Sequence, residues 1–160
     1  MKTEDFVILR DSREQRGHGW NFGRKDGFNS TKVQCLKTGD YTIEGYEDIL
    51  CIERKGSIVE IAGNVTQKRF ENELERMCSI EHSFIICEFD FYELMTFPNS
   101  AKVAWSVKKS FKITPTFIMK RINEFQLNYP AKWLFTGAYG QQVANSIIKR
   151  IIEKYEPAQK

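Results

Sequence analysis

Two short segments of the chain carry acidic and basic side chains at a spacing suited to metal-dependent cleavage of phosphodiesters. Asp40 follows Gly39, and the triplet Glu53-Arg54-Lys55 begins thirteen positions after Asp40. Residues two apart on a strand point to the same side of a sheet, so Glu53 and Lys55 should project together while Arg54 points the opposite way. Two carboxylates can hold a divalent cation, and a nearby ammonium group can stabilise developing negative charge.

The residues between these segments predict a hairpin that brings the charged groups together. A chain reversal over residues 45–48 pairs positions whose numbers sum to 93, which sets Asp40 opposite Glu53. Directly opposed residues lie about 4.5–5.5 Å apart, close enough for both carboxylates to hold one cation. Lys55 would then lie two residues beyond Glu53 on the same strand, with its side chain on the same face of the sheet.

A surface hairpin with solvated charges is the alternative explanation of this pattern. Apolar residues in the two strands argue against it, because the charges then interrupt segments of a buried type. Buried charge is costly unless a metal ion or a partner compensates it. The apolar residues concerned are Val33, Cys35, Ile49, Cys51 and Ile52.

The composition predicts a single globular domain over residues 1–160. The chain is 41% hydrophobic and 13% aromatic, and at this length it can bury roughly 70% of its unfolded surface around one core. No window approaches the roughly 18 apolar residues of a membrane span, and the charged start lacks the pattern of a signal peptide. The net charge of +3 permits a nucleic-acid partner without demanding one.

The cysteines and histidines do not form a zinc-binding pattern. The four cysteines contain no Cys-x-x-Cys pair, and the two histidines, His18 and His82, are isolated. Free thiols are therefore expected, a usage typical of a reducing intracellular compartment such as the cytoplasm, nucleoid or nucleus. The cysteines are Cys35, Cys51, Cys78 and Cys87.

Hydrophobic periodicity predicts alternating strands and helices. Apolar runs predict strands at residues 6–9, 84–87 and 133–135, besides the two hairpin strands. Helical periodicity predicts helices after the capping box of Ser57 and Glu60, with a break near residues 63–64, and further helices after Pro115 and Gly140. The order of these elements predicts an α/β fold with a mixed central sheet flanked by helices.

Two further segments have compositions that allow a role in binding. The glycine-rich residues 16–30 read either as a mobile, substrate-contacting lid or as an ordinary long connection. Residues 101–114 interleave basic and apolar side chains, a pattern that can line a phosphate path or belong to a solvated loop. Its lysines are Lys102, Lys108, Lys109 and Lys112, and its apolar residues include Val103, Trp105, Val107 and Phe111.

Three ordered blocks carry a specific resemblance. They are Asp11-Ser12-Arg13-Glu14 after an apolar strand, Gly39-Asp40, and Glu53-Arg54-Lys55 before a helix that bears Arg69. These blocks resemble the nuclease domain of the XPF family of structure-specific DNA endonucleases, whose pattern is Asp-x-Arg-Glu, Gly-Asp and Glu-Arg-Lys-x-x-x-Asp. The likeness is strong over residues 6–89 and looser over the carboxyl half.

The resemblance implies a restriction-endonuclease-like core, a Mg²⁺ or Mn²⁺ cofactor, and incision of branched or junction-containing DNA that leaves 5′-phosphate and 3′-hydroxyl ends. It assigns metal binding to Asp40 and Glu53, with Asp11 as a further acidic group. It assigns a catalytic role to Lys55, and supporting roles around the site to Arg13, Glu14 and Arg54.

The chain departs from the family pattern in two ways. The last acidic position of the pattern is occupied by Val59, and Glu60 lies one residue further on, where the capping box also explains it. Family members commonly append tandem helix-hairpin-helix modules, for which 160 residues leave no room, so the chain resembles the stand-alone form of the domain.

Other functions remain compatible with these residues. A DNA-binding or dimerisation scaffold that has lost catalysis is the main alternative, and an exonuclease, an RNA-cleaving enzyme or a restriction enzyme would keep the same fold. A homodimer through the carboxyl-terminal helices is also expected, since the last helix shows a broad apolar surface, although ordinary core packing explains it equally well. The residues concerned are Ile147, Ile148, Ile151 and Ile152.

Overall fold

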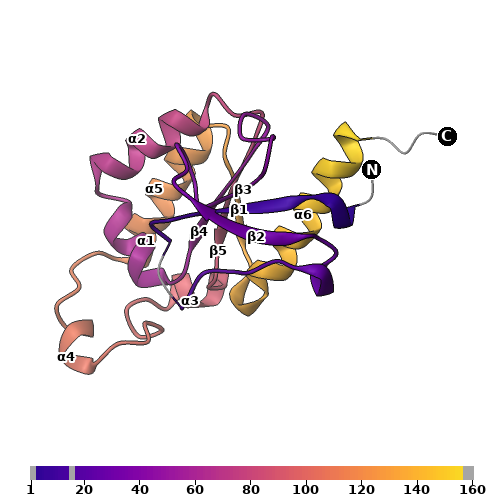
Figure 1. The fold of residues 1–160 in the computed structure, drawn as a ribbon. Helices are drawn as coiled ribbons and strands as arrows, with labels where there is room; N and C mark the ends of the chain where they lie inside the picture. The colour runs from indigo at the N-terminus through magenta and orange to yellow at the C-terminus, as the bar shows by residue number, and fades with distance from the viewer. Residues whose placement is uncertain (1–2, 15–16, 157–160) are drawn as a thin grey trace.

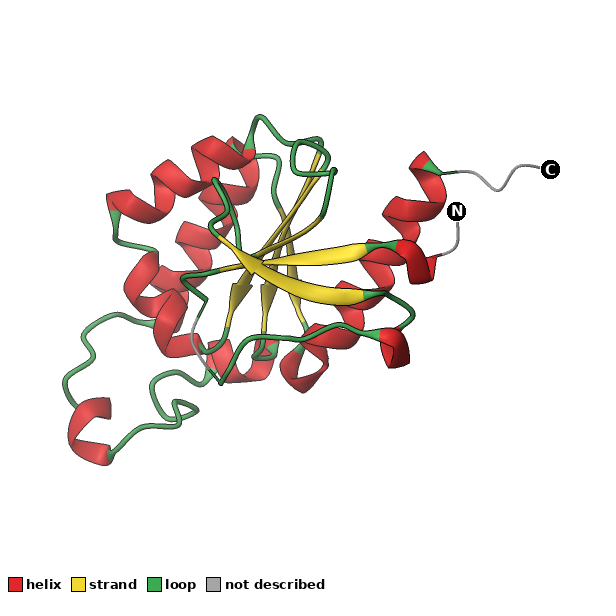
Figure 2. Ribbon diagram, viewed as in Figure 1, coloured by secondary structure: helices red, strands yellow, loops and turns green. Residues whose placement is uncertain are grey.

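The computed structural model describes residues 3–14 and 17–156 and contains a mixed six-stranded sheet with helices on both faces (Figures 1 and 2). The strand order is β2-β1-β3-β4-β5-β6. Strand β1 is parallel to β2, β3 is antiparallel to both β1 and β4, and β4, β5 and β6 are parallel. The predicted mixed α/β sheet is confirmed. The strands are β1 (Val7–Asp11), β2 (Ser30–Gln34), β3 (Tyr41–Ile43), β4 (Leu50–Lys55), β5 (His82–Cys87) and β6 (Lys132–Phe135).

Six α-helices and three short 3-10 helices connect the strands within the described residues. The predicted break after the first helix is confirmed, because α1 ends at Asn64 and α2 begins at Lys68. In the part of the chain that is described, no helix combines the length and the apolar content of a membrane span. The α-helices are α1 (Ile58–Asn64), α2 (Lys68–Met77), α3 (Phe91–Met95), α4 (Trp105–Lys108), α5 (Pro115–Asn128) and α6 (Gly140–Tyr155); the 3-10 helices are η1 (Thr3–Asp5), η2 (Arg24–Asp26) and η3 (Gly137–Tyr139).

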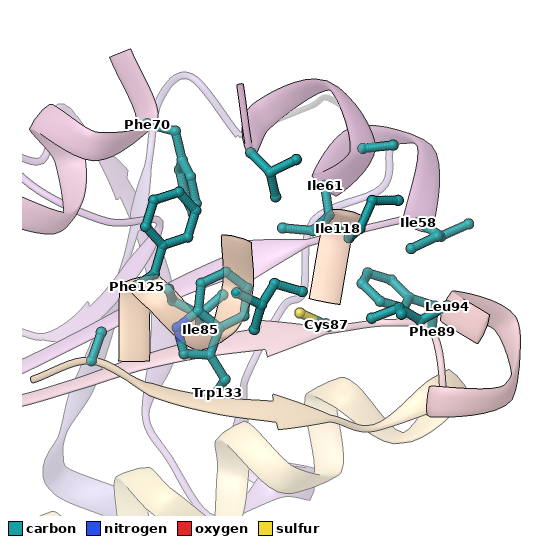
Figure 3. Packing of buried hydrophobic residues seen from close by; sticks show 14 of the residues in the cluster. Ile58, Ile61, Phe70, Ile85, Cys87, Phe89, Leu94, Ile118, Phe125 and Trp133 are labelled. Carbon is teal, nitrogen blue, oxygen red and sulfur yellow. The ribbon is translucent and has the colours of Figure 1, made fainter. Parts of the chain in front are cut away.

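The sheet separates two hydrophobic clusters, and alternate residues of the central strands contribute to each. Cys51 and Ile85 face the cluster formed with α1, α2 and α5, which Figure 3 shows from close by. Ile52 and Ile86 face the second cluster, formed with α6 and the amino-terminal aromatic residues. This alternation is the two-residue period of extended strands. It places neighbouring residues of β4 in different environments.

The sequence interpretation of residues 30–35 is wrong in one respect. Residues 30–34 form the separate edge strand β2, which raises the predicted five strands to six. Val33 is 53% exposed and Cys35 is exposed, so neither belongs to a buried strand of the hairpin. An edge strand has a neighbouring strand on one side only, and none of the residues of β2 is buried.

The described part of the glycine-rich segment is a packed connection rather than a lid. Its aromatic residues Trp20, Phe22 and Phe28 are almost fully buried. Trp20 stacks on Tyr41 with ring centroids 4.9 Å apart, and its backbone N–H donates a hydrogen bond of 2.6 Å to the Tyr41 hydroxyl. Arg16, the first residue of the predicted segment, lies outside the described residues. The aromatic anchors therefore tie residues 17–30 to the sheet.

The apolar residues of α6 serve the core of their own chain. Ile148, Ile151 and Ile152 are buried in the second cluster, and Ile147 packs against it. The expectation that α6 carries surplus apolar surface for a dimer is therefore wrong, and the alternative of core packing holds for this helix. The broad stripe is needed because α6 packs on one face of the sheet together with the amino-terminal aromatic residues. This helix lies on the side opposite to α1, α2 and α5 (Figure 1).

Candidate active site

Strand β4 delivers two charged side chains to the face of the sheet that α1 and α2 cover. Glu53 and Lys55 are each only 5% exposed. The Lys55 ammonium group donates a hydrogen bond of 2.7 Å to Glu53 Oε1. Arg54 lies on the opposite face, with its guanidinium carbon 5.7 Å from the ring centroid of Trp20. The strand alternation predicted for the triplet is confirmed.

The hairpin register brings Asp40 beside this pair. Tyr41 is paired with Ile52, so the paired numbers sum to 93 as predicted. The Asp40 N–H donates to the Ile52 carbonyl at 2.9 Å, and the Arg54 N–H donates to Asp40 Oδ2 at 2.8 Å. Asp40 is thus held at the start of β3 with its carboxylate turned toward β4.

Gly39 is required where the chain enters this hairpin strand. Its φ of +72° lies in the left-handed region, and a Cβ atom at this position would lie 2.3 Å from Cys51 Sγ. Such a contact is far below van der Waals separation, and an L residue with that φ is strained. The glycine of the Gly-Asp block therefore allows the close backbone approach that positions Asp40.

The Glu60 side chain reaches the site, whereas its predicted part in the capping box is not formed. Its backbone N–H donates to Ser57 Oγ at 3.2 Å, and its own Oε2 accepts a hydrogen bond of 2.9 Å from the Gly56 N–H. Its other oxygen lies 3.5 Å from the Lys55 ammonium nitrogen. Ser57 therefore caps α1. The Glu60 carboxylate binds the N–H of Gly56 in place of the N–H of Ser57, so only half of the predicted capping box is formed, and it also contacts Lys55 on β4.

These groups line one polar pocket of about 680 Å³ on the α1 and α2 side of the sheet. All seven predicted site residues contribute to its lining, so the folded chain brings the three sequence blocks together. The ionisable residues at the pocket are Asp11, Arg13, Glu14, His18, Asp40, Glu53, Arg54, Lys55, Glu60, Arg69, Glu73 and Arg76.

Burial and mutual repulsion make the two central carboxylates unusually easy to protonate. Burial raises the pKa of Glu53 to about 7, in spite of the opposing effect of the Lys55 charge. Burial also raises the pKa of Asp40 well above its ordinary value, and the charges of Glu53 and Glu14 add to this effect. A cation at the pocket would reverse both shifts, because a nearby positive charge favours the ionised carboxylate.

Lys55 keeps its proton at neutral pH although it is buried. Burial acts to lower the pKa of an ammonium group, but the charges of Glu53 and Glu60 outweigh it and raise the pKa of Lys55 above its ordinary value. Its nitrogen also lies 4.8 Å from the ring centroid of Phe70 on α2. Lys55 is therefore a fixed positive charge and hydrogen-bond donor inside the pocket.

Asp11 lines the pocket, but its carboxylate is already bound within the protein. It accepts hydrogen bonds from Arg13 Nε at 2.7 Å and from the Leu36 N–H at 2.8 Å. Burial acts to raise the pKa of Asp11, yet these hydrogen bonds lower it below its usual range. These contacts leave the predicted role of Asp11 as a further metal-binding group untested, and it stays a prediction. They also assign Asp11 to holding Arg13 at the rim, where the Arg13 side chain stays 63% exposed.

Arg54 and Glu14 belong to a buried charge network behind the pocket. Arg54 Nη1 lies 3.3 Å from Glu14 Oε1, and Arg54 Nε donates a hydrogen bond of 2.7 Å to Glu88 Oε2. Glu88 also accepts a hydrogen bond of 2.8 Å from the Trp20 ring. These contacts agree with the predicted orientation of Arg54 away from Glu53 and Lys55, and Glu88 is a partner that the sequence did not indicate.

Helix α2 supplies two pocket residues that the sequence interpretation missed, Glu73 and Arg76, besides Arg69, which it named. Phe70, Leu74 and Met77 form the buried stripe of this helix. The residues one position earlier, Arg69, Glu73 and Arg76, share the same spacing and line the pocket. Reading the helical period on polar residues as well as on apolar ones would have found this set.

A family model described as the ERCC4 domain matches residues 10–144, a range that contains nearly all of the sheet and every residue assigned to the site. The chain belongs to the ERCC4 domain family. The resemblance to XPF-type nuclease domains is confirmed by this match. No curated protein gives a significant match to the chain.

Solved structures of an archaeal XPF share the fold of this ERCC4 domain. XPF from Aeropyrum pernix aligns over 96% of this chain and 64% of its own, with a TM-score of 0.63 and 18% identity. The same XPF in complex with DNA aligns over 97% and 68% of the two chains, with a TM-score of 0.62 and 18% identity. The predicted restriction-endonuclease-like α/β architecture is confirmed. The chain spans less than two thirds of the first of these structures.

The donor set of the ERCC4 domain fits a divalent ion held by few protein ligands. Within residues 3–14 and 17–156, no group of three or more acidic, histidine or cysteine side chains forms a complete metal cage. Asp40 and Glu53 nevertheless offer two hard oxygen ligands. Burial and neighbouring carboxylates raise the pKa of both, and a bound cation would favour their ionised forms. Mg²⁺ is commonly held by one or two carboxylates together with water and substrate phosphate. The two residues therefore fit Mg²⁺ or Mn²⁺.

We predict that the metal-free ERCC4 domain loses stability as the pH rises through about 7. Glu53 has an ordinary pKa of 4.5 when unfolded and about 7 when folded. Its contribution is fully present below the unfolded pKa and is lost as the pH passes the folded one. Asp40, whose pKa is also raised, acts in the same direction.

Thermal unfolding in EDTA measures this effect between about pH 6.5 and 8.5. An ordinary histidine is about half protonated at the lower limit and neutral at the upper one, so the lowered pKa of His82 acts in the opposite direction in the lower part of the window. Across this window the ionisation of Glu53 alone should reduce the free energy of unfolding by about 1 kcal/mol, which lowers Tm by about 3 °C. Adding Mg²⁺ at the upper pH should restore the loss. A free energy that stays constant or increases across the window would contradict the prediction.

Proposed function

We propose that this ERCC4 domain is a Mg²⁺- or Mn²⁺-dependent endonuclease that hydrolyses phosphodiester bonds in DNA, at branched or duplex-to-single-strand junctions. The observation that carries the proposal is the convergence of Asp40, Glu53 and Lys55 in one pocket on one face of the sheet. The existence of an Aeropyrum pernix XPF structure in complex with DNA supports DNA as the substrate class. We further infer that residues 1–160 act as a single nuclease domain.

The central residues have separate tasks in this proposal. Asp40 and Glu53 would hold the divalent ion, which supplies an activated water and neutralises charge on the scissile phosphate. Lys55 is protonated and buried, so its N–H groups can orient the attacking water or stabilise the negative charge that develops on the phosphate. Low exposure strengthens this electrostatic effect, because less water screens it.

The arginine residues divide into two groups by their contacts. Arg13 has an exposed side chain anchored on Asp11 at the pocket rim, and we assign it to the phosphates flanking the cut. Arg69 and Arg76 on α2 also line the pocket, and we assign them the same task. Arg54 is satisfied by Glu14 and Glu88 behind the strand, and we assign it to positioning β4.

A cleavage panel tests the proposal. The protein and its Lys55→Ala variant are incubated with Mg²⁺ or Mn²⁺ and with end-labelled flaps, forks, plain duplex, single strands and an RNA control. We expect metal-dependent cuts near the junctions, products that carry 5′-phosphate and 3′-hydroxyl ends, and loss of cutting in EDTA. Ligation of the products reports both end groups.

The same panel separates the competing functions. Binding of DNA without cutting in either metal would favour an inactive scaffold of the same fold. Degradation from free ends, or cutting of RNA alone, would assign a different nuclease activity. Cutting that survives Lys55→Ala would contradict the role assigned to that residue.

We also propose that the domain forms a homodimer through its carboxyl-terminal helices, and the apolar surface for it lies on α5. Leu127 is 86% exposed and Phe117 is 40% exposed on that helix, whereas the isoleucines of α6 are buried. Sedimentation at micromolar concentrations should give a dimer that Leu127→Glu dissociates. A monomer at every concentration, or a dimer unaffected by Leu127→Glu, would contradict this prediction.

A further inference from the structure

The positive charge of the chain is concentrated in one continuous segment. Residues 94–123 contain six lysines and arginines and no aspartate or glutamate, a net charge of +6. The whole chain has 24 basic and 21 acidic residues, so the remaining residues carry 18 basic and 21 acidic side chains, a net charge of −3. The segment therefore differs in sign from the rest of the molecule.

Part of this segment, residues 98–114, forms an arm that stands away from the sheet and its covering helices and has α4 near its tip (Figure 1). Trp105 at the start of α4 is 63% exposed, and Val107 is 43% exposed. The chain has two other tryptophans, Trp20 and Trp133, and both are buried. The Lys109 ammonium nitrogen lies 5.4 Å from the centroid of the Trp105 ring. The arm thus presents a large flat aromatic side chain among lysines.

The base of the arm is fixed to the protein. The rings of Phe97 and Phe111 lie 4.9 Å apart, and Phe111, Val103 and Ile113 pack against the first hydrophobic cluster. The Lys108 ammonium group donates a hydrogen bond of 2.7 Å to the Asn99 carbonyl. The exposed Trp105 ring is therefore held outward by a buried base.

Resting on the nuclease function proposed above, we infer that the arm binds single-stranded DNA, with Trp105 stacking on an unpaired base and the surrounding lysines contacting phosphates. Aromatic side chains next to basic residues are the usual elements of single-strand binding, because every base offers a stacking face. The surplus of positive charge attracts the phosphate backbone.

The shape of the arm favours a single strand over a duplex. In a duplex the base faces are stacked on one another, so a protruding ring can reach them only at an end or a junction. Helix α4 has four residues, too few to lie in a major groove as the recognition helix of a duplex-binding protein does. In the proposed enzyme the arm would hold the single-stranded branch of a junction while the pocket receives the phosphate to be cut.

Binding of a labelled single-stranded oligonucleotide, measured by fluorescence anisotropy in EDTA, tests the inference without any cleavage. Trp105→Ala should weaken binding about five- to a hundredfold, the range measured for loss of one stacked base. Trp105→Phe keeps an aromatic face and should retain most of the affinity. Wild-type tryptophan emission should be quenched on binding, since Trp105 is exposed, and the quenching should disappear in Trp105→Ala.

The salt dependence of the same binding tests the lysines. Lys102→Gln combined with Lys112→Gln should reduce the slope of log affinity against log salt by about 1.4, at roughly 0.7 for each phosphate contact. A matched control, Arg24→Gln combined with Lys25→Gln on η2, removes two charges near the second cluster and should leave the slope nearly unchanged. Equal slopes for both double variants would overturn the role of the arm lysines.

The outcomes distinguish the arm from the proposed nuclease site. Single-strand affinity unchanged in a folded Trp105→Ala variant would overturn the inference even if junction cutting is observed. An altered sedimentation coefficient of the free protein in that variant, with unchanged DNA affinity, would assign the arm to protein contacts and would also overturn it. Trp105-dependent binding in a protein that cuts nothing would uphold the arm while the nuclease proposal fails.

Discussion

Replacement of Lys55 by alanine should reduce metal-dependent cleavage by at least about a hundredfold, the effect typical of removing one preorganised electrostatic donor. Lys55 is the protonated group that lies next to the two carboxylates, and its side chain is only 6% exposed. When the Lys55 ammonium group is removed, water therefore cannot easily take over its electrostatic role in the pocket. Single-turnover cleavage of the preferred junction measures the loss, with protein in excess so that weaker binding does not contribute.

The same replacement should destabilise the protein in a pH-dependent way. Without Lys55, the buried Glu53 loses its closest positive partner, so its pKa rises further above 7 and ionisation costs more. The loss of stability should thus be small near pH 5.5 and larger near pH 8.5. Lys55→Met is the matched control, because it keeps the packing against Phe70 and removes the charge alone. Full cleavage by Lys55→Met would contradict the electrostatic role.

Asp40→Asn should abolish cleavage and, in the absence of metal, make the protein more stable. The charge of Glu53 is one cause of the raised pKa of Asp40, after burial, so removing the Asp40 charge relieves repulsion in the pocket. An asparagine oxygen can still accept the hydrogen bond from the Arg54 N–H. We expect the free energy of unfolding to increase by about 1 kcal/mol near pH 8, which raises Tm by about 3 °C. An increase of this size is typical of a single stabilising substitution.

Thermal unfolding in EDTA and in excess Mg²⁺ measures this second effect. The wild type should gain stability from Mg²⁺, whereas Asp40→Asn should gain less because one ligand charge is gone. Glu47→Gln removes one exposed carboxylate from the same hairpin and should leave Tm and the response to Mg²⁺ nearly unchanged. A metal-free Asp40→Asn variant less stable than the wild type at pH 8 would show that Asp40 is stabilising and would refute the repulsion argument.

The features that sequence predicted correctly are local ones. The pairing of Tyr41 with Ile52 confirms the predicted hairpin register, in which the numbers of paired residues sum to 93. This register was predictable because a short connection between two strands leaves few alternatives. The opposite orientation of Arg54 follows from the two-residue period of a strand. The break between α1 and α2 and the cap at Ser57 depend on residues within one turn of one another.

The features that sequence missed depend on contacts between distant segments. Glu88 completes the partners of Arg54 from 34 positions away, and the polar face of α2 reaches the pocket only because its apolar face packs on the core. An apolar stripe such as that of α6 can either form a dimer interface or pack against the sheet of its own chain. Periodicity in the sequence cannot distinguish these two cases, and the structure shows the second. Val33 was misjudged for the same reason, since edge position is a property of the whole sheet.

Sequence by itself determined which chemical groups this ERCC4 domain possesses and which side of its strands they occupy. Tertiary structure decided how those charges are balanced: Asp11 is paired with Arg13, and Arg54 with Glu14 and Glu88, while the Lys55 charge acts on both Glu53 and Asp40. The physical reason is that charge interactions depend on distance through space and on removal from water. Both quantities are set by the packing of segments that lie far apart along the chain.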